Sequence, residues 1–144
     1  TGMVAGLGTI TPASGFVGPG GGLIIGLSAG VVCYYATGYI KRTLKIDDSL
    51  DVFPVHGVGG ILGTLLTGVF ASNALGVFSG QEDIAIGAQV SIQAIGILSA
   101  ICYTAVVTYV ILKVTDAVVG NRVDEEDEMQ GLDLVSHDER GYDL

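Results

Sequence analysis

A single histidine stands in a long uncharged segment of the sequence. His56 is the only titratable side chain in residues 52–81. A neutral imidazole offers one hydrogen-bond donor and one acceptor, which suits a small hydrogen-bonding solute in a passage too apolar for a bare ion. Ionisable groups at membrane depth usually face a pore or a partner. The residues leave one alternative open, a neutral histidine bonded to a backbone carbonyl inside a helix bundle.

Three glycines, Gly57, Gly59 and Gly60, follow this histidine closely. They remove side-chain bulk, so that a neighbouring helix or a narrow channel could approach the imidazole. Burial disfavours the charged imidazolium, and we therefore expect the ring of His56 to be neutral.

Apolar helices must hold this histidine. Residues 1–40, 52–81 and 84–112 contain no Asp, Glu, Lys or Arg, and a helix needs about 20 mostly apolar residues to cross a bilayer. Residues 18–22, with four glycines and Pro19, break the first stretch in two. The pattern predicts an all-α membrane protein with helices over residues 2–17, 22–40, 52–69 and 84–119. The first should be kinked or stopped early near Pro12.

The charged residues place the loops and the tail. Lys41, Arg42 and Lys45 separate the second and third expected helices, and loops rich in Lys and Arg stay in the cytoplasm. Residues 18–22 and 71–83 should then lie outside, and residues 121–144 should form a cytoplasmic tail. That tail carries −7 of the formal net charge of −9. Its acidic run, residues 124–128, is typical of a solvated face or a disordered end.

Cysteine and glycine usage adds no catalytic signal. Cys33 and Cys102 lie in apolar stretches, so we expect neither a disulfide framework nor a metal site. Glycines recur at every fourth position in two expected helices: Gly22, Gly26, Gly30, Gly59 and Gly63. This spacing is typical of close helix packing in lipid. The sequence opens in an apolar run without Met or a signal peptide, and we expect a piece of a longer protein.

Three segments resemble the Amt/Mep/Rh family of ammonium transporters. Residues 46–61, Ile-Asp-Asp-Ser-Leu-Asp-Val-Phe-Pro-Val-His-Gly-Val-Gly-Gly-Ile, resemble the signature of the family's tenth helix. Residues 5–17, Ala-Gly-Leu-Gly-Thr-Ile-Thr-Pro-Ala-Ser-Gly-Phe-Val, look like its eighth helix. Residues 122–142 look like its regulatory C-terminal tail. The segments follow the family's order and together span nearly the whole chain.

The resemblance implies a fold of eleven transmembrane helices, assembled as a homotrimer in the plasma membrane with one pore per subunit. This chain would hold the last four helices and the tail. The family recruits ammonium outside, removes a proton and passes ammonia through a narrow apolar pore past paired imidazoles. The resemblance implies no enzyme, no cofactor and no metal.

The resemblance also assigns roles to residues near the histidine. His56 matches the second of two pore histidines, and Gly57, Gly59 and Gly60 would pack helices near the pore. Asp51 matches a carboxylate near the cytoplasmic pore exit. A role for Asp51 as a helix N-cap is the alternative.

Five tail residues match the family's regulatory segment: Gly131, Leu132, Asp133, His137 and Tyr142. In the family this tail packs on the cytoplasmic face and touches the adjacent subunit. The same face can be blocked by a PII-type signalling protein. Val135 stands where some eukaryotic members carry a phosphorylatable Thr, so we expect no such switch at this position.

Rhomboid-type intramembrane serine proteases are a rival class. Ser14 and His56 have their serine-then-histidine order, and His56, Gly59 and Gly63 fit their His-x-x-Gly-x-x-x-Gly pattern. The protease motif requires Gly-x-Ser-Gly, whereas residues 12–15 read Pro-Ala-Ser-Gly. Ser14 should lie near the outer end of its helix and His56 toward the inner end of another. We therefore expect no hydrogen bond between a nucleophile and a base here.

Overall fold

The computed structural model describes residues 1–72 and 84–141, and every regular element within them is helical. In chain order the elements are α1 Gly2–Ile10, η1 Thr11–Ala13, α2 Pro19–Gly38, η2 Tyr39–Thr43, η3 Phe53–Val58, α3 Gly59–Phe70, α4 Ile86–Val119, α5 Glu125–Gln130 and α6 Leu132–His137. The element η1 is a 3-10 helix, whereas η2 and η3 are π-helical turns at the end of α2 and the start of α3. The prediction of an all-α chain is confirmed for these residues. The chain forms two compact units, residues 1–100 and 101–144.

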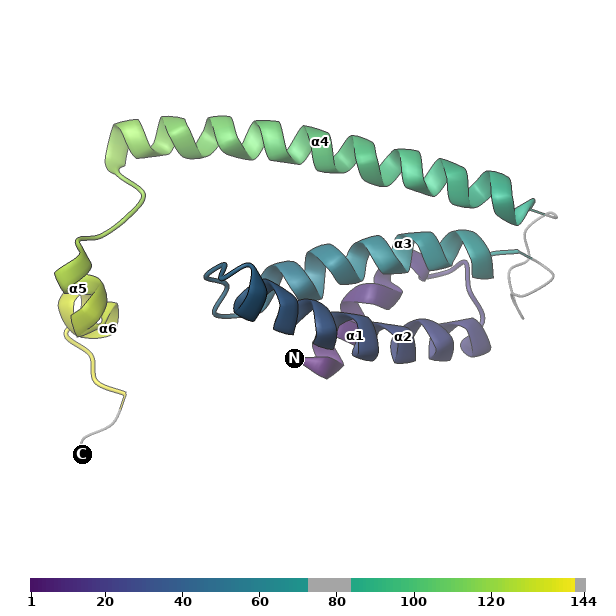
Figure 1. Ribbon diagram of the computed structural model, residues 1–144, viewed down its shortest axis with the longest axis horizontal. Helices are drawn as coiled ribbons and strands as arrows, with labels where there is room; N and C mark the ends of the chain where they lie inside the picture. The colour runs from purple at the N-terminus through teal and green to yellow at the C-terminus, as the bar shows by residue number, and fades with distance from the viewer. Residues whose placement is uncertain (73–83, 142–144) are drawn as a thin grey trace. The chain divides into compact units, whose positions relative to one another are not determined.

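In the first unit, α1, α2 and α3 pack against one another (Figure 1). The positions they bury are mostly small, including Ala5 and Thr9 on α1, Ala29 and Cys33 on α2, and Gly63 on α3. Small side chains let helix backbones approach closely, which drives association in lipid. Large apolar side chains on α1 and α2 stay exposed in this chain: Met3, Leu7, Leu23, Leu27 and Val31.

The helices α1 and α3 approach each other closely at Gly59 and Gly63. A Cβ built at Gly63 would overlap the backbone carbonyl oxygen of Thr9. A Cβ at Gly59 would lie 2.7 Å from Thr9 Oγ1. The four-residue glycine spacing therefore marks a helix contact on α3. On α2 only the first of the three glycines meets a neighbour: a Cβ at Gly22 would lie 3.6 Å from Ile10 Cδ1, whereas a Cβ at Gly26 or Gly30 would have no described neighbour within 4 Å.

The helix α1 ends earlier than the predicted residue 17. Its α-helical part stops at Ile10, and a 3-10 turn continues only to Ala13. Pro12 explains the stop, because its nitrogen carries no hydrogen for the next intrahelical bond. Gly15, with φ of +82°, then turns the chain away. The predicted range 2–17 is thus wrong at its C-terminal end.

The helix α2 begins at Pro19 rather than at the predicted residue 22. Proline fits the first helical position because its missing N–H has no intrahelical partner there. The N–H of Gly22 donates to the carbonyl of Gly18 at 2.9 Å, which closes the first turn. A Cβ at Gly21 would lie 2.5 Å from a methyl carbon of Val17 and 3.1 Å from Phe70 Cβ. The first apolar stretch is divided as predicted, but at residues 14–18 rather than 18–22. Glycine at position 21 instead serves tight packing inside a helix.

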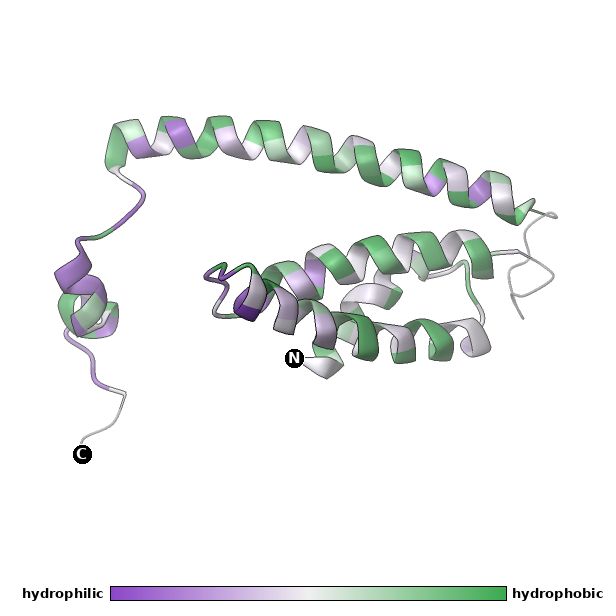
Figure 2. Cartoon of the chain, in the orientation of Figure 1, coloured by the Kyte–Doolittle hydropathy of each residue, from purple (hydrophilic) through white to green (hydrophobic). Residues whose placement is uncertain are grey.

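Three helices are long and apolar enough to cross a bilayer: Pro19–Thr43, Phe53–Phe70 and Ile86–Val119, with 25, 18 and 34 residues. With nine residues, α1 is too short, so the described residues hold three such helices where four were predicted. The last one, α4, is about 51 Å long at 1.5 Å per residue, against a hydrocarbon core of about 30 Å. It must tilt or extend beyond the bilayer. Figure 2 shows hydrophobic residues along α4 and hydrophilic residues in α5.

In the second unit, side chains organise the end of α4 and the short helices of the tail. Asn121 Nδ2 donates to the carbonyl of Leu112 at 2.7 Å, after Gly120 has turned to φ of +78°. Arg122 pairs with Glu128 at 3.0 Å. The acidic run predicted to be solvated or disordered forms the first turn of α5. Negative charge is favoured there because it faces the positive end of the helix dipole.

Candidate functional site

The turn that carries His56 is anchored by an aspartate in the preceding loop. The two carboxylate oxygens of Asp48 accept hydrogen bonds from the N–H groups of Val52 and Phe53, each at 2.8 Å. Pro54 needs no such acceptor and fits the first turn. The turn is a π-helix, a wider geometry that often occurs at functional sites. Asp48 therefore sets where the helix starts and how far along it His56 lies.

The imidazole of His56 lies beside α1. A Cβ built at Gly8 would be 3.8 Å from His56 Nδ1 and 3.8 Å from the carbonyl oxygen of Val55. The absence of a side chain at Gly8 thus leaves the imidazole room next to the α1 backbone. His56 is exposed in this chain and forms no hydrogen bond with residues 1–72 or 84–141. The described residues therefore do not supply the backbone carbonyl that would accept a hydrogen bond from a histidine buried in the bundle.

The three glycines that follow His56 have different surroundings. A Cβ at Gly57 would lie 2.8 Å from the ring of Phe53. Gly59 faces α1 and α2, because a Cβ there would lie 3.3 Å from Cys33 Sγ as well as against Thr9. Gly60 has no described atom within 4 Å of its Cβ position. Of the three, Gly60 therefore leaves open space, and the other two accommodate neighbours other than the imidazole.

Asp51 makes an ion pair. Its Oδ1 lies 2.6 Å from Lys41 Nζ, and the side chain of Asp51 is 16% exposed. The same Lys41 nitrogen donates to the carbonyl of Ser49 at 3.4 Å. The N-cap alternative for Asp51 is wrong, because the capping bonds go to Asp48. The Lys41–Asp51 pair instead links η2 to the loop just before η3.

Asp51 also lines a cavity of about 300 Å³ between α1 and α2. Ala5, Cys33 and Thr37 are among its other lining residues. His56 is not among them, so these helices do not place Asp51 and His56 in one cavity.

The described residues do not assemble a serine protease site. His56 Nδ1 lies next to Gly8, and Ser14 follows six residues later, roughly 9 Å along a helical path. No hydrogen bond joins Ser14 to His56 within residues 1–72 and 84–141. The same residues contain no group of three or more His, Cys, Asp or Glu side chains placed to hold a metal ion.

Most of the predicted tail residues lie at the junction of two short helices. Gly131 separates α5 from α6 with φ of +98°, and a Cβ there would lie 2.8 Å from Asp133 Oδ1. Leu132 begins α6 and His137 ends it. Tyr142 lies outside the described residues.

Two neighbours of the histidine turn were missed by the sequence reasoning. Gly8 is one of several glycines in residues 2–8, and only the crossing of α1 with η3 distinguishes it. Asp48 had a weak local signal, an acidic side chain shortly before the expected helix start at Val52. Asp47 and Asp51 share this signal, so the sequence does not choose among the three.

Three apolar helices of membrane-spanning length, one of them carrying a lone histidine, define part of a multi-pass integral membrane protein. Comparison with known proteins gives the family, because the profile of the Ammonium Transporter Family matches residues 1–142. An ammonium transporter of Aquifex aeolicus is 47% identical over 146 residues, which are 100% of this chain and 34% of the relative. Ammonium transporter Amt1 of Archaeoglobus fulgidus is 40% identical over 147 residues, which are 99% of this chain and 36% of the relative. The chain belongs to the ammonium transporter family, and it spans about one third of the length of these relatives.

Proposed function

We propose that this chain is the C-terminal third of an ammonium transporter and that His56 lines its conducting pore. One observation carries the proposal: His56 is exposed and lacks a hydrogen-bond partner among the described residues, on a helix without other titratable groups. An imidazole buried only for packing would satisfy its nitrogens, since buried polar groups nearly always find a partner. A pore-lining imidazole keeps them free for the solute.

The proposed chemistry uses neutral imidazole. Ammonia is a small molecule that can both donate and accept hydrogen bonds, and so can the two ring nitrogens of His56. A second histidine from a preceding part of the protein would complete the pair. An apolar passage excludes ammonium and potassium ions because neither can shed its water there cheaply. The proton of ammonium therefore has to leave before ammonia enters.

The proposed assembly is the family's homotrimer of eleven-helix subunits in the plasma membrane, with the tail in the cytoplasm. The basic residues before η3 favour that orientation. Asp51 would lie near the cytoplasmic exit, paired to Lys41. The tail around Gly131 would contact a neighbouring subunit, and a PII-type protein would bind the same face.

The experiment that tests the pore assignment compares two replacements of His56. The chain is joined to the remaining two thirds of the Aquifex aeolicus relative, and uptake of ammonium and potassium is measured per folded trimer in proteoliposomes. His56→Ala removes the hydrogen-bonding site, and ammonium uptake should fall at least about tenfold, a barrier change of about 1.4 kcal/mol. In His56→Glu an ionised carboxylate should admit potassium, since pore-lining charge selects by sign.

Cys102→Ala is the matched control, because Cys102 is an exposed residue of α4 and its loss should leave uptake unchanged. If both His56 variants reduce only the yield of trimer, while folded trimers keep normal uptake and selectivity, His56 is a structural residue and the proposal fails.

A further inference from the structure

Gly8 leaves a space beside the imidazole of His56. A Cβ built at Gly8 would lie 3.8 Å from His56 Nδ1 and 3.8 Å from the carbonyl oxygen of Val55, and no other neighbouring atom of the described residues lies within 4 Å. These are distances of ordinary van der Waals contact, so a methyl group would fit there without a clash. Gly8 is half-buried and His56 is exposed.

The α1 side of this space is held in place by the next residue. Thr9 is 0% exposed. A Cβ at Gly63 would overlap the backbone carbonyl oxygen of Thr9, and a Cβ at Gly59 would lie 2.7 Å from Thr9 Oγ1. Such close packing leaves α1 little freedom to move toward or away from the helix that carries His56.

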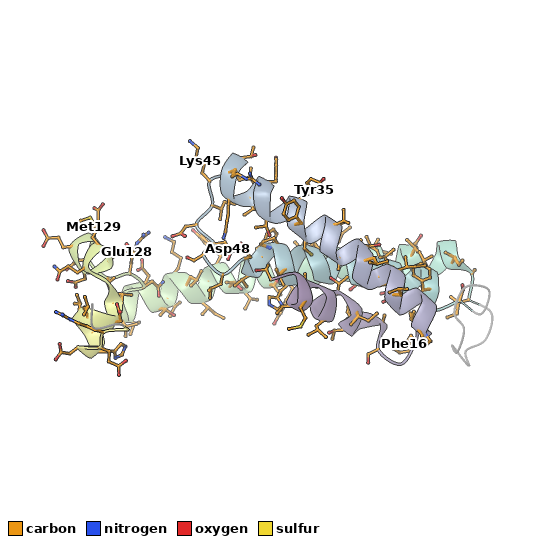
Figure 3. The ribbon with its side chains drawn as sticks, turned by 90° about the horizontal axis from the view of Figure 1, so that it is seen from below. Phe16, Tyr35, Lys45, Asp48, Glu128 and Met129 are labelled. Carbon is orange, nitrogen blue, oxygen red and sulfur yellow. The ribbon has the colours of Figure 1, made fainter. Side chains whose placement is uncertain are left out.

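The histidine side is held by hydrogen bonds. Asp48 lies in the loop before η3 (Figure 3), and its carboxylate accepts hydrogen bonds from the N–H groups of Val52 and Phe53, each at 2.8 Å. These bonds fix the start of the turn from which His56 projects. Because both sides are held, the group at position 8 determines the width of the space between α1 and the imidazole.

We infer that Gly8 is a specificity-determining residue of the proposed pore, where its missing side chain lets the solute pass between α1 and His56. The inference rests on the proposed function, because it requires His56 to line the pore. Ammonia and methylamine offer the same kind of hydrogen bond to an imidazole nitrogen, but methylamine is larger by one methyl group. A methyl group at position 8 therefore obstructs methylamine more than ammonia.

Uptake of ammonium and of methylammonium by Gly8→Ala tests this role. It is measured per folded trimer, with the chimera that joins this chain to the Aquifex aeolicus relative. The variant should fold, because its new methyl group meets no described neighbour closer than 3.8 Å and alanine favours a helix. One methylene group in a fitted site changes discrimination by about tenfold or more, so methylammonium uptake should fall at least about tenfold more than ammonium uptake.

Gly6→Ala is the matched control on the same helix. Gly6 lies two residues before Gly8, on another face of α1, and no described atom lies within 4 Å of its Cβ position. Both uptakes should stay unchanged in this variant. An equal change in the uptake ratio of Gly6→Ala and Gly8→Ala would show a general effect of alanine on α1 and overturn the inference.

The result for His56→Ala separates failure of this inference from failure of the proposed function. If His56→Ala loses uptake while Gly8→Ala keeps the wild-type ratio of methylammonium to ammonium uptake, His56 lines the pore but Gly8 does not determine its specificity. Equal loss of both solutes in Gly8→Ala is the result expected if a second imidazole occupies the space, and it also overturns the inference. Normal uptake in His56→Ala refutes the proposed function and this inference together.

Discussion

Two aspartates three residues apart have different roles at the start of the helix that carries His56. Asp48 accepts two backbone N–H groups at 2.8 Å, whereas Asp51 pairs with Lys41, whose side chain is 37% exposed. Removing a helix cap costs about 0.5–2 kcal/mol, and a partly exposed ion pair contributes about 1 kcal/mol or less. The free energy of unfolding should therefore fall more in Asp48→Ala than in Asp51→Asn.

Denaturant unfolding of the two variants in one detergent checks this order. The Asp48→Asn variant keeps one acceptor oxygen and should fall between them. A larger loss in Asp51→Asn than in Asp48→Ala would contradict the order and give the Lys41–Asp51 pair the main anchoring role.

At the scale of the residue, the sequence identified His56 as the side chain to examine. It did not identify the residues around His56. His56 stood out because a charged or titratable group is costly at membrane depth, and that reasoning needs no fold. The contact of Gly8 with the imidazole arises from the crossing of α1 and η3, which no local pattern contains. Choosing between Asp48 and Asp51 as the cap required the backbone, in which Asp51 has a left-handed φ of +58°.

At the scale of the element, two glycines on α3 have opposite surroundings, one packed against α1 and one open. A side chain at Gly63 would overlap the backbone of Thr9, whereas one at Gly60 meets no described atom within 4 Å. Gly63→Ala should lower the free energy of unfolding by about 1–3 kcal/mol, because overpacking forces α1 and α3 apart. Gly60→Ala should be neutral or stabilising by up to about 1 kcal/mol, because alanine favours a helix.

Unfolding measurements and uptake per folded trimer together distinguish the two variants. If Gly60 borders the proposed pore, Gly60→Ala should lower uptake without lowering stability. Equal stability of the Gly63→Ala variant and the wild type would show that α1 and α3 are farther apart at Gly63 than in this structure.

The turn between α5 and α6 depends on one glycine. Gly131 has φ of +98°, a sparsely populated conformation that costs a residue with a Cβ about 1–3 kcal/mol. Gly131→Ala should therefore disrupt the turn and, if the tail regulates transport, change uptake by the trimer. Gly141→Ala is the control, because Gly141 has no positive φ and no described atom within 4 Å of its Cβ position. If both variants show identical uptake and identical protease sensitivity, the tail does not regulate transport through this turn.

Helix type was predictable from the sequence, and so were the ends of the helices over residues 53–70 and 86–119, to within two residues. The end of α1 and the start of α2 were not. The absence of charge over residues 1–40, 52–81 and 84–112 suffices to predict apolar helices. The start of α2 was misjudged because glycine usually disfavours a helix, whereas at Gly21 contact with Val17 and Phe70 outweighs that cost. Such tertiary contacts cannot be read from composition.

At the scale of the whole molecule, the apolar surface exceeds what this chain can cover by itself. The most hydrophobic window of α4 has no buried residue, and large apolar side chains on α1 and α2 are exposed as well. Lipid can cover the side chains of a regular helix, but irregular backbone at membrane depth is tolerated only where protein covers it or where it lines a water-filled cavity. Residues 14–18, between η1 and α2, have irregular backbone, but they belong to the loop expected outside the bilayer, where water can satisfy it. The exposed apolar side chains of this unit are therefore what lipid or further protein has to cover.

We accordingly expect the 144-residue chain, reconstituted without other protein, to give no ammonium uptake above that of empty liposomes. It supplies one histidine of the proposed pair, and it spans about one third of the length of its relatives. The chimera with the Aquifex aeolicus relative should restore uptake, because it adds the helices that cover α1 and that would provide the other histidine. Both preparations are compared at equal protein density, with methylammonium as the tracer. Uptake by the isolated chain that is lost in His56→Ala would mean that these helices form a pore by themselves, and it would overturn the proposed division of the pore between this chain and a preceding part.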